Sequence, residues 1–183
     1  ELGVDVAALL PDAGAGAAPS GPTQEDVENA QAMSDDDRVE MIRGMVARLA
    51  GRLEDNPDDL EGWLRLGRAY GALGDAAGAR DAYAQAATLA PDDADVLEAY
   101  AIAIVEGVPE DARLPAEAAV VARRLVEIDG ENPAGLWLLG RAEAESGNAG
   151  AARVLWRRLL AQLPPGGPDH DAVRGAIDAL GAE

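Results

Sequence analysis

The feature that most constrains this chain is a spaced pattern of large and small residues that begins near Leu60. Bulky side chains alternate with glycine and alanine over about 34 residues, and a proline ends the pattern. The small residues allow two helices to approach closely, Gly74-Asp75 forms the turn between them, and the proline stops the second helix. The positions that carry the pattern are Trp63, Leu66, Gly67, Tyr70, Ala79, Tyr83, Ala86 and Pro91.

The same register returns later in the chain, because Gly140 stands 73 residues after Gly67. The spacing within each copy matches the tetratricopeptide repeat (TPR), a helix–turn–helix unit of about 34 residues. Two such repeats account for about 68 residues, so we place about five extra residues in the degenerate middle copy, within 107–115. We therefore predict an all-α TPR solenoid of three repeats, with flanking N-terminal helices and a C-terminal capping helix. The expected repeats are about 60–93, 94–132 and 133–166, and the capping helix is 168–181.

The segments before the repeats differ from one another in composition. Residues 1–22 are expected to form an acidic linker rich in Pro, Gly and Ala, because 11–22 offer no apolar face to offset ordering entropy. The TPR domain is expected to cover 23–183, opening with a short helix capped by Thr23. Ser34 is predicted to cap a longer helix over 35–55, which needs a partner surface because two glycines weaken it.

Composition excludes several classes of function. The chain has 34 acidic residues against 15 basic ones and a net charge of −19, which disfavours binding to nucleic acid. It has no Lys, no Cys and one His, so we expect no enzyme, no catalytic residues, no metal site and no cofactor. No stretch of 18 apolar residues is present, and we expect any membrane anchor to lie upstream of Glu1.

A solenoid without catalytic residues is expected to bind polypeptide. In TPR arrays the first helix of each repeat lines a concave groove, and an apolar stripe Leu64–Ile102–Trp137 in such a groove suits an amphipathic helix. The alternative for Trp137 is packing against the second helix of the preceding repeat. The candidate peptide-binding residues are Leu64, Arg68, Glu98, Ile102, Val105, Trp137 and Arg141.

Four strings are more specific than a generic TPR: MIRGMV (41–46), NPDDLEGW (56–63), ENPAGLWLLG (131–140) and LLAQLPPGGPD (159–169). With them the chain, from about Glu25 to its end, resembles the periplasmic TPR domain of the cytochrome c maturation protein family CcmI, also called CycH. The resemblance implies a chaperone that holds the C-terminal amphipathic helix of apocytochrome c and delivers it to the haem ligation subunits CcmF and CcmH. It also implies a location on the periplasmic side of the bacterial inner membrane.

Two other functions remain open from the residues. One is a TPR scaffold that organises folded envelope proteins without an unfolded client. The other is a subunit that touches haem directly, for which His170 is the one available imidazole. Preference for the apo over the holo form of a cytochrome distinguishes the chaperone from the scaffold.

Overall fold

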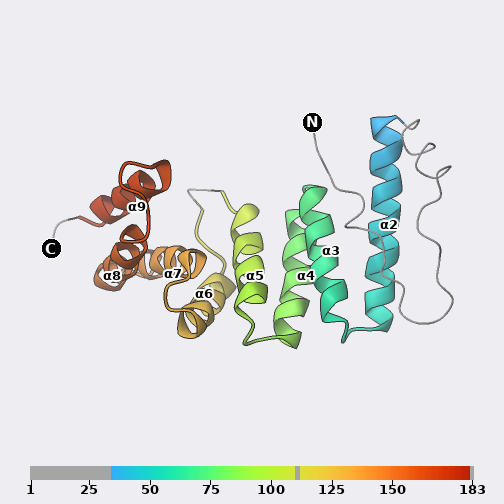
Figure 1. The fold of residues 1–183 in the computed structure, drawn as a ribbon, viewed down its shortest axis with the longest axis horizontal. Helices are drawn as coiled ribbons and strands as arrows, with labels where there is room; N and C mark the ends of the chain where they lie inside the picture. The colour runs from blue at the N-terminus through green and yellow to red at the C-terminus, as the bar shows by residue number, and fades with distance from the viewer. Residues whose placement is uncertain (1–33, 110–111, 182–183) are drawn as a thin grey trace.

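The computed structural model describes residues 34–109 and 112–181 of the chain. These residues form α-helices that follow one another along the long axis of the molecule, from α2 at one end to α9 at the other (Figure 1). The helices are α2 (Asp35–Asp55), α3 (Leu60–Ala72), α4 (Ala76–Leu89), α5 (Ala94–Glu106), α6 (Ala116–Ile128), α7 (Pro133–Glu145), α8 (Ala149–Leu160) and α9 (Pro168–Ala179).

Each helix packs on the next one along the chain, and the closest pairs are α3 with α4 and α7 with α8. Beyond neighbours in sequence, α5 also contacts α7. This sequential stacking of helix pairs confirms the predicted all-α TPR-type fold. The expected linker at 1–22 and the expected short helix after Thr23 lie outside the described residues.

Polar side chains cap the starts of several helices. Ser34 accepts a hydrogen bond from the backbone N–H of Asp37, as the sequence predicts for the start of α2. Asp59 and Asp75 do the same for the third residue of α3 and of α4, at 2.8 and 2.9 Å. Side-chain oxygens at these positions satisfy N–H groups that have no partner within the helix.

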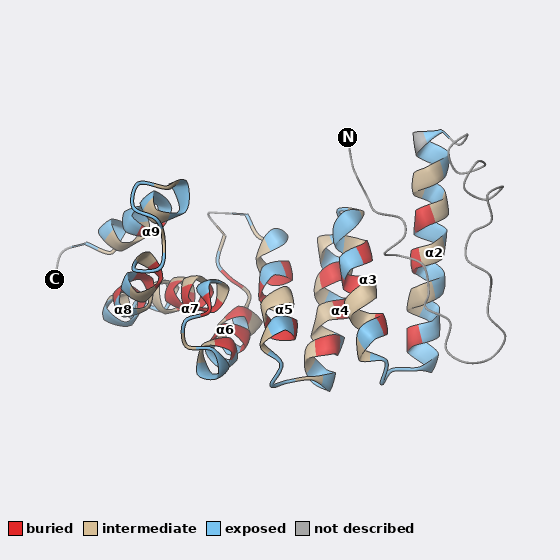
Figure 2. Ribbon diagram, in the orientation of Figure 1, coloured by how far each residue is buried: buried red, intermediate tan, exposed pale blue. Residues whose placement is uncertain are grey.

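Within residues 34–109 and 112–181, the buried residues form three clusters along the array rather than one central core, and Figure 2 shows buried positions in successive helices from α2 to α8. The first cluster joins α2 to α3 and α4 around Leu53 and Leu66. The second joins α5, α6 and α7 around Ile104 and Leu125. The third joins α7, α8 and α9 around Leu136. Each cluster therefore depends on neighbouring elements, as in a solenoid.

The first and third helix pairs each contain a close contact of the same kind, between a glycine and an aromatic ring. A Cβ added to Gly67 in α3 would lie 2.7 Å from the ring of Tyr83 in α4. The corresponding Gly140 in α7 lies against the indole of Trp156 in α8. Glycine at these positions lets a large aromatic ring fill the space between the helices.

The connection between α5 and α6 runs from Gly107 to Pro115, where the sequence places the extra residues of the middle repeat. Over the described part of the chain, no helix combines the length and the hydropathy that crossing a bilayer requires.

Candidate functional site

A hollow of about 270 Å³ opens between α3 and α5, the first helices of two successive pairs. Arg68 from α3 and Ile102 and Glu106 from α5 line it, and the ring of Tyr83 from α4 forms part of its wall. Two of the predicted groove residues, Arg68 and Ile102, therefore share one concave surface. Glu106 and Tyr83 were not among the predicted site residues.

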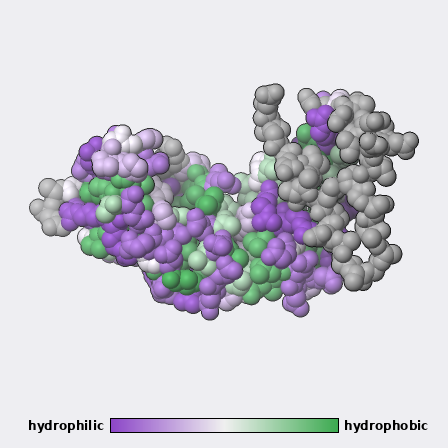
Figure 3. Space-filling model, in the orientation of Figure 1, coloured by the Kyte–Doolittle hydropathy of each residue, from purple (hydrophilic) through white to green (hydrophobic). Residues whose placement is uncertain are grey.

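Ile102 provides the apolar contact surface of this hollow. Its side chain is 44% exposed, which makes it one of the few large aliphatic residues open to solvent. On the face shown in Figure 3, green hydrophobic areas lie separately among purple hydrophilic ones. An exposed aliphatic side chain inside a concave surface is a suitable anchor for an apolar face of a ligand.

The hollow also carries one charge of each sign. Burial raises the pKa of the Tyr83 hydroxyl above its ordinary value, while the Arg68 guanidinium lowers it and the Glu106 carboxylate raises it. Both charged groups are thus close enough to act on the same hydroxyl. The surface that a ligand meets is an apolar patch between a cation and an anion.

Glu98 links α5 to the start of α7, which is the first helix of the next pair. Its Oε2 accepts a hydrogen bond of 2.6 Å from Nδ2 of Asn132, which is buried. Asn132 also caps α7, because its Oδ1 accepts from the N–H of Gly135 at 2.8 Å. Glu98 is therefore occupied by a structural contact between α5 and α7.

Trp137 packs partly within its own helix pair. Its ring stacks on Trp156 of α8, with centroids 5.6 Å apart and planes inclined by 30°. Trp156 Nε1 also donates to the backbone carbonyl of Trp137 at 3.2 Å. The side chain is half-buried, so one part of the indole belongs to the core and another part meets solvent.

Arg141 holds the long connection between α5 and α6. Its Nη2 donates to the carbonyl of Ala112 at 2.6 Å, and its Nε donates to Glu145 at 3.1 Å. Glu145 in turn accepts from the N–H of Leu114 at 2.9 Å. This pair therefore fastens the connection to α7.

Leu64 and Val105 are both half-buried, and Val105 packs against the second core cluster. The structure thus brings Arg68 and Ile102 together in one hollow. Glu98, Trp137 and Arg141 instead make contacts further along the array.

The described residues contain no group of three or more His, Asp or Glu side chains placed to hold a metal ion. His170 lies in the first turn of α9, with Nδ1 3.4 Å from Asp171. The His170 side chain is only 13% exposed, so it packs at the start of the helix.

The stacked helix pairs, with glycine at their close approach and an open hollow between first helices, define a TPR-type solenoid domain. A family model described as "Cytochrome c-type biogenesis protein H TPR domain" matches residues 24–170. The chain belongs to this family and has a role in cytochrome c-type biogenesis through a TPR domain. The family is one of maturation factors, in agreement with the expectation that the domain is not an enzyme.

Individual relatives agree with the family. The chain is 37% identical to the cytochrome c-type biogenesis protein CcmH of Escherichia coli over 128 residues, 69% of this chain and 35% of the relative. It is 31% identical to the CycH protein of Pseudomonas aeruginosa over 133 residues, 73% of this chain and 32% of the relative. The match therefore spans about a third of the length of these relatives.

Solved structures support the fold alone. A crystal structure of MamA superposes with a TM-score of 0.57 at 15% identity, covering 86% of both chains. A putative protein-binding protein from Bacteroides ovatus gives a TM-score of 0.51 at 16% identity, covering 85% of this chain and 95% of the other.

Proposed function

We propose that the domain is an apocytochrome c chaperone that binds the client's C-terminal amphipathic helix in the hollow between α3 and α5. Ile102 carries the proposal, because it is an exposed aliphatic side chain within a concave surface. The apolar face of the helix lies on Ile102, and Arg68 and Glu106 meet its polar edges. Leu64 and the solvent-facing part of Trp137 extend the contact along the array.

The charge of the chain favours a basic client. With a net charge of −19, the chain attracts a helix that carries lysine and so increases the association rate at low salt. In this proposal the domain stands on the periplasmic side of the bacterial inner membrane, held by an anchor upstream of these residues. It passes the client to the haem ligation subunits CcmF and CcmH.

Titration calorimetry tests the proposal with a synthetic C-terminal helix of a c-type cytochrome and with the folded holo-cytochrome. We expect micromolar binding of the peptide, about −8 kcal/mol, and none of the holo-protein. Ile102→Asp should weaken the affinity for the peptide by at least about tenfold, since a buried carboxylate would face the apolar surface of the helix.

Val154→Asp is the matched control, because Val154 in α8 is an aliphatic side chain that is 59% exposed. It should leave the affinity unchanged. Equal binding of the apo-peptide and the holo-cytochrome would contradict the chaperone and favour the scaffold for folded partners. Equal loss in the two variants would contradict the assignment of the groove.

A further inference from the structure

A second and larger hollow lies between α2 and α3, with a volume of about 520 Å³. It uses a different side of α3 from the first hollow, since it is lined by Arg65 and Ala69 instead of Arg68 and Ala72. A ligand bound here would therefore not occupy the surface assigned to the cytochrome helix.

The floor of this second hollow is apolar. Ile42 and Val46 are buried, while Met45 and Leu49 are half-buried and line the opening. These four positions form one stripe of α2, at the i, i+3, i+4, i+7 spacing of a single helix face. Because α2 packs mainly on α3 within the described residues, part of this stripe stays uncovered.

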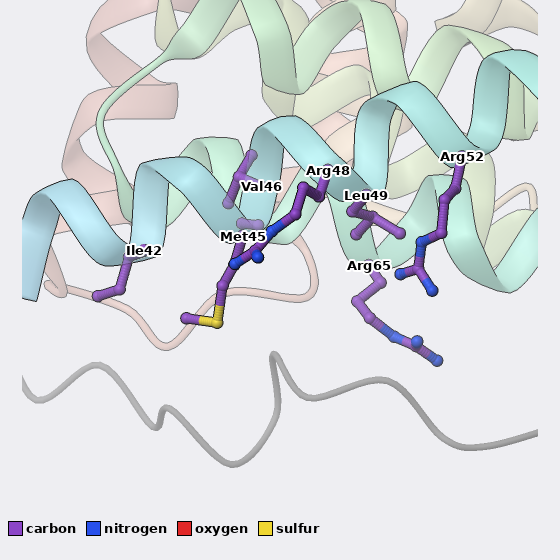
Figure 4. Close-up of a pocket in the computed structure, with 8 residues that line it drawn as sticks. Ile42, Met45, Val46, Arg48, Leu49, Arg52 and Arg65 are labelled. Carbon is purple, nitrogen blue, oxygen red and sulfur yellow. The ribbon is translucent and has the colours of Figure 1, made fainter. Parts of the chain in front are cut away.

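Three arginines surround the apolar floor. Arg48 and Arg52 extend from α2 and Arg65 from α3, on the same side as Met45 and Leu49 (Figure 4). The residues that line the hollow include no carboxylate. The local charge is thus opposite to that of the chain, which carries −19 overall.

Within the described part of the chain, the guanidinium groups of these arginines also have no ion-pair partner. Within residues 34–109 and 112–181, Arg48, Arg52 and Arg65 form no ion pair, although Arg43 pairs with Glu40 and other arginines in this acidic chain are paired as well. Guanidinium groups that flank an apolar stripe can each bind a carboxylate in a bidentate manner.

We propose that this second hollow docks an amphipathic helix of a partner protein whose apolar face is bordered by Asp or Glu. The apolar face covers Met45 and Leu49, and the acidic edges pair with Arg48, Arg52 and Arg65. The proposal goes beyond the chaperone function and does not depend on it. The domain then holds two helices of opposite charge, one basic between α3 and α5 and one acidic between α2 and α3.

Two synthetic helices test this proposal on the full chain by titration calorimetry. Both have the same leucine face, and one carries glutamate and the other lysine along the edges. We expect the glutamate peptide to bind with micromolar affinity. Arg48→Glu should weaken the affinity for this peptide at least tenfold. Arg157→Glu, which changes an exposed arginine of α8, is the matched control and should leave its affinity unchanged, as should Ile102→Asp.

Three results would overturn the proposal. The first is no binding of the glutamate peptide, and the second is equal weakening by Arg48→Glu and Arg157→Glu. The third concerns residues 1–33, which contain six carboxylates and no arginine in the sequence. If the peptide binds only after these carboxylates are changed to amides, the chain's own N-terminal segment competes for the hollow and a partner helix is the wrong occupant. Circular dichroism of each variant verifies that the helices are retained.

Discussion

The backbone of Gly67 in α3 lies directly against the ring of Tyr83 in α4, and a Cβ at Gly67 would be 2.7 Å from Tyr83 Cζ. Gly140 and Trp156 repeat this relationship between α7 and α8. Neither glycine is needed for a positive φ, because both lie inside regular helices. Each is needed because it sets how closely two helices approach around one aromatic ring.

Gly67→Ala should therefore destabilise the domain although alanine favours helices. The added methyl group forces the ring of Tyr83 to move, and overpacking of this kind costs about 1–3 kcal/mol. Urea unfolding followed by circular dichroism measures the change. Gly51→Ala is the control, because nothing lies within 4 Å of a Cβ at this exposed position in α2. It should stabilise the domain by up to about 1 kcal/mol. If Gly67→Ala leaves the stability unchanged, the ring of Tyr83 can move aside without cost.

The fold was predictable because its determining contacts are local. Trp63, Gly67, Tyr83 and Pro91 fall within one repeat, so their spacing encodes a helix pair without knowledge of the rest of the chain. The same holds for Ser34, whose capping hydrogen bond reaches only to Asp37. Solenoids favour this kind of reasoning, since each repeat contacts only its neighbours.

The candidate site was less predictable, because several of its residues have partners about one repeat away. Glu98 bonds to Asn132, and Arg141 bonds to Ala112, at separations of 34 and 29 residues. The position of a residue within the repeat predicts which side of the helix faces the groove, but it does not predict these hydrogen-bond partners. The sequence predicts that the helix over 35–55 needs a partner surface, but the spacing of Met45 and Leu49 does not reveal that α2 leaves part of its apolar stripe open.

The Trp137–Trp156 stack gives a prediction about how to read mutations of Trp137. Trp137→Ala should destabilise the domain by about 2 kcal/mol, because it removes a half-buried indole and one partner of the stack. Trp137→Phe should retain most of that stability. Near-ultraviolet circular dichroism and urea unfolding measure both effects. If Trp137→Ala unfolds like the wild type, the stack contributes nothing, and a loss of peptide affinity can be assigned to the groove alone.

The Arg141–Glu145 pair predicts local protection of the connection between α5 and α6. Glu145→Ala removes the acceptor for the Leu114 amide and leaves Arg141 with one partner fewer. The Leu114 amide should then exchange with solvent at least about tenfold faster, which hydrogen exchange by NMR can measure. Glu127→Ala is the control, because Glu127 pairs with Arg124 on α6, away from this connection. Unchanged exchange at Leu114 in Glu145→Ala would show that other contacts hold the loop.

Tyr83 predicts a loss of stability in alkaline solution. Burial raises the pKa of its hydroxyl in the folded state, whereas the unfolded chain has the ordinary value of about 10. The folded state therefore keeps its proton more strongly, so the stability is complete below pH 10 and falls as the pH rises through the folded pKa. Tyr83→Phe keeps the ring against Gly67 but removes the hydroxyl. Its urea midpoint should fall less than that of the wild type between pH 9 and 11, and equal slopes would contradict this origin of the effect.

Asn132 predicts an unusual response to the substitution of asparagine by aspartate. Asp59 and Asp75 show that aspartate caps helices well at this position in the first pair. Asn132→Asp keeps the acceptor for Gly135 but removes the donor to Glu98 and places a second carboxylate where the amide lay, 2.6 Å from Glu98 Oε2. At neutral pH this should cost about 2–3 kcal/mol, because a buried carboxylate at position 132 and the half-buried carboxylate of Glu98 repel and one acceptor has no donor.

The pH dependence of that cost distinguishes repulsion from loss of the cap. The carboxylate pair has a folded pKa raised by mutual repulsion, so the penalty is full at pH 7 and shrinks as the pH falls and one carboxyl takes up a proton. Urea unfolding of Asn132→Asp and the wild type from pH 7 to pH 4 should show the two stabilities converging. Asp75→Asn, at an exposed cap, should differ little from the wild type over this range. A constant difference between Asn132→Asp and the wild type would mean that Glu98 turns away from the new carboxylate and does not couple α5 to α7.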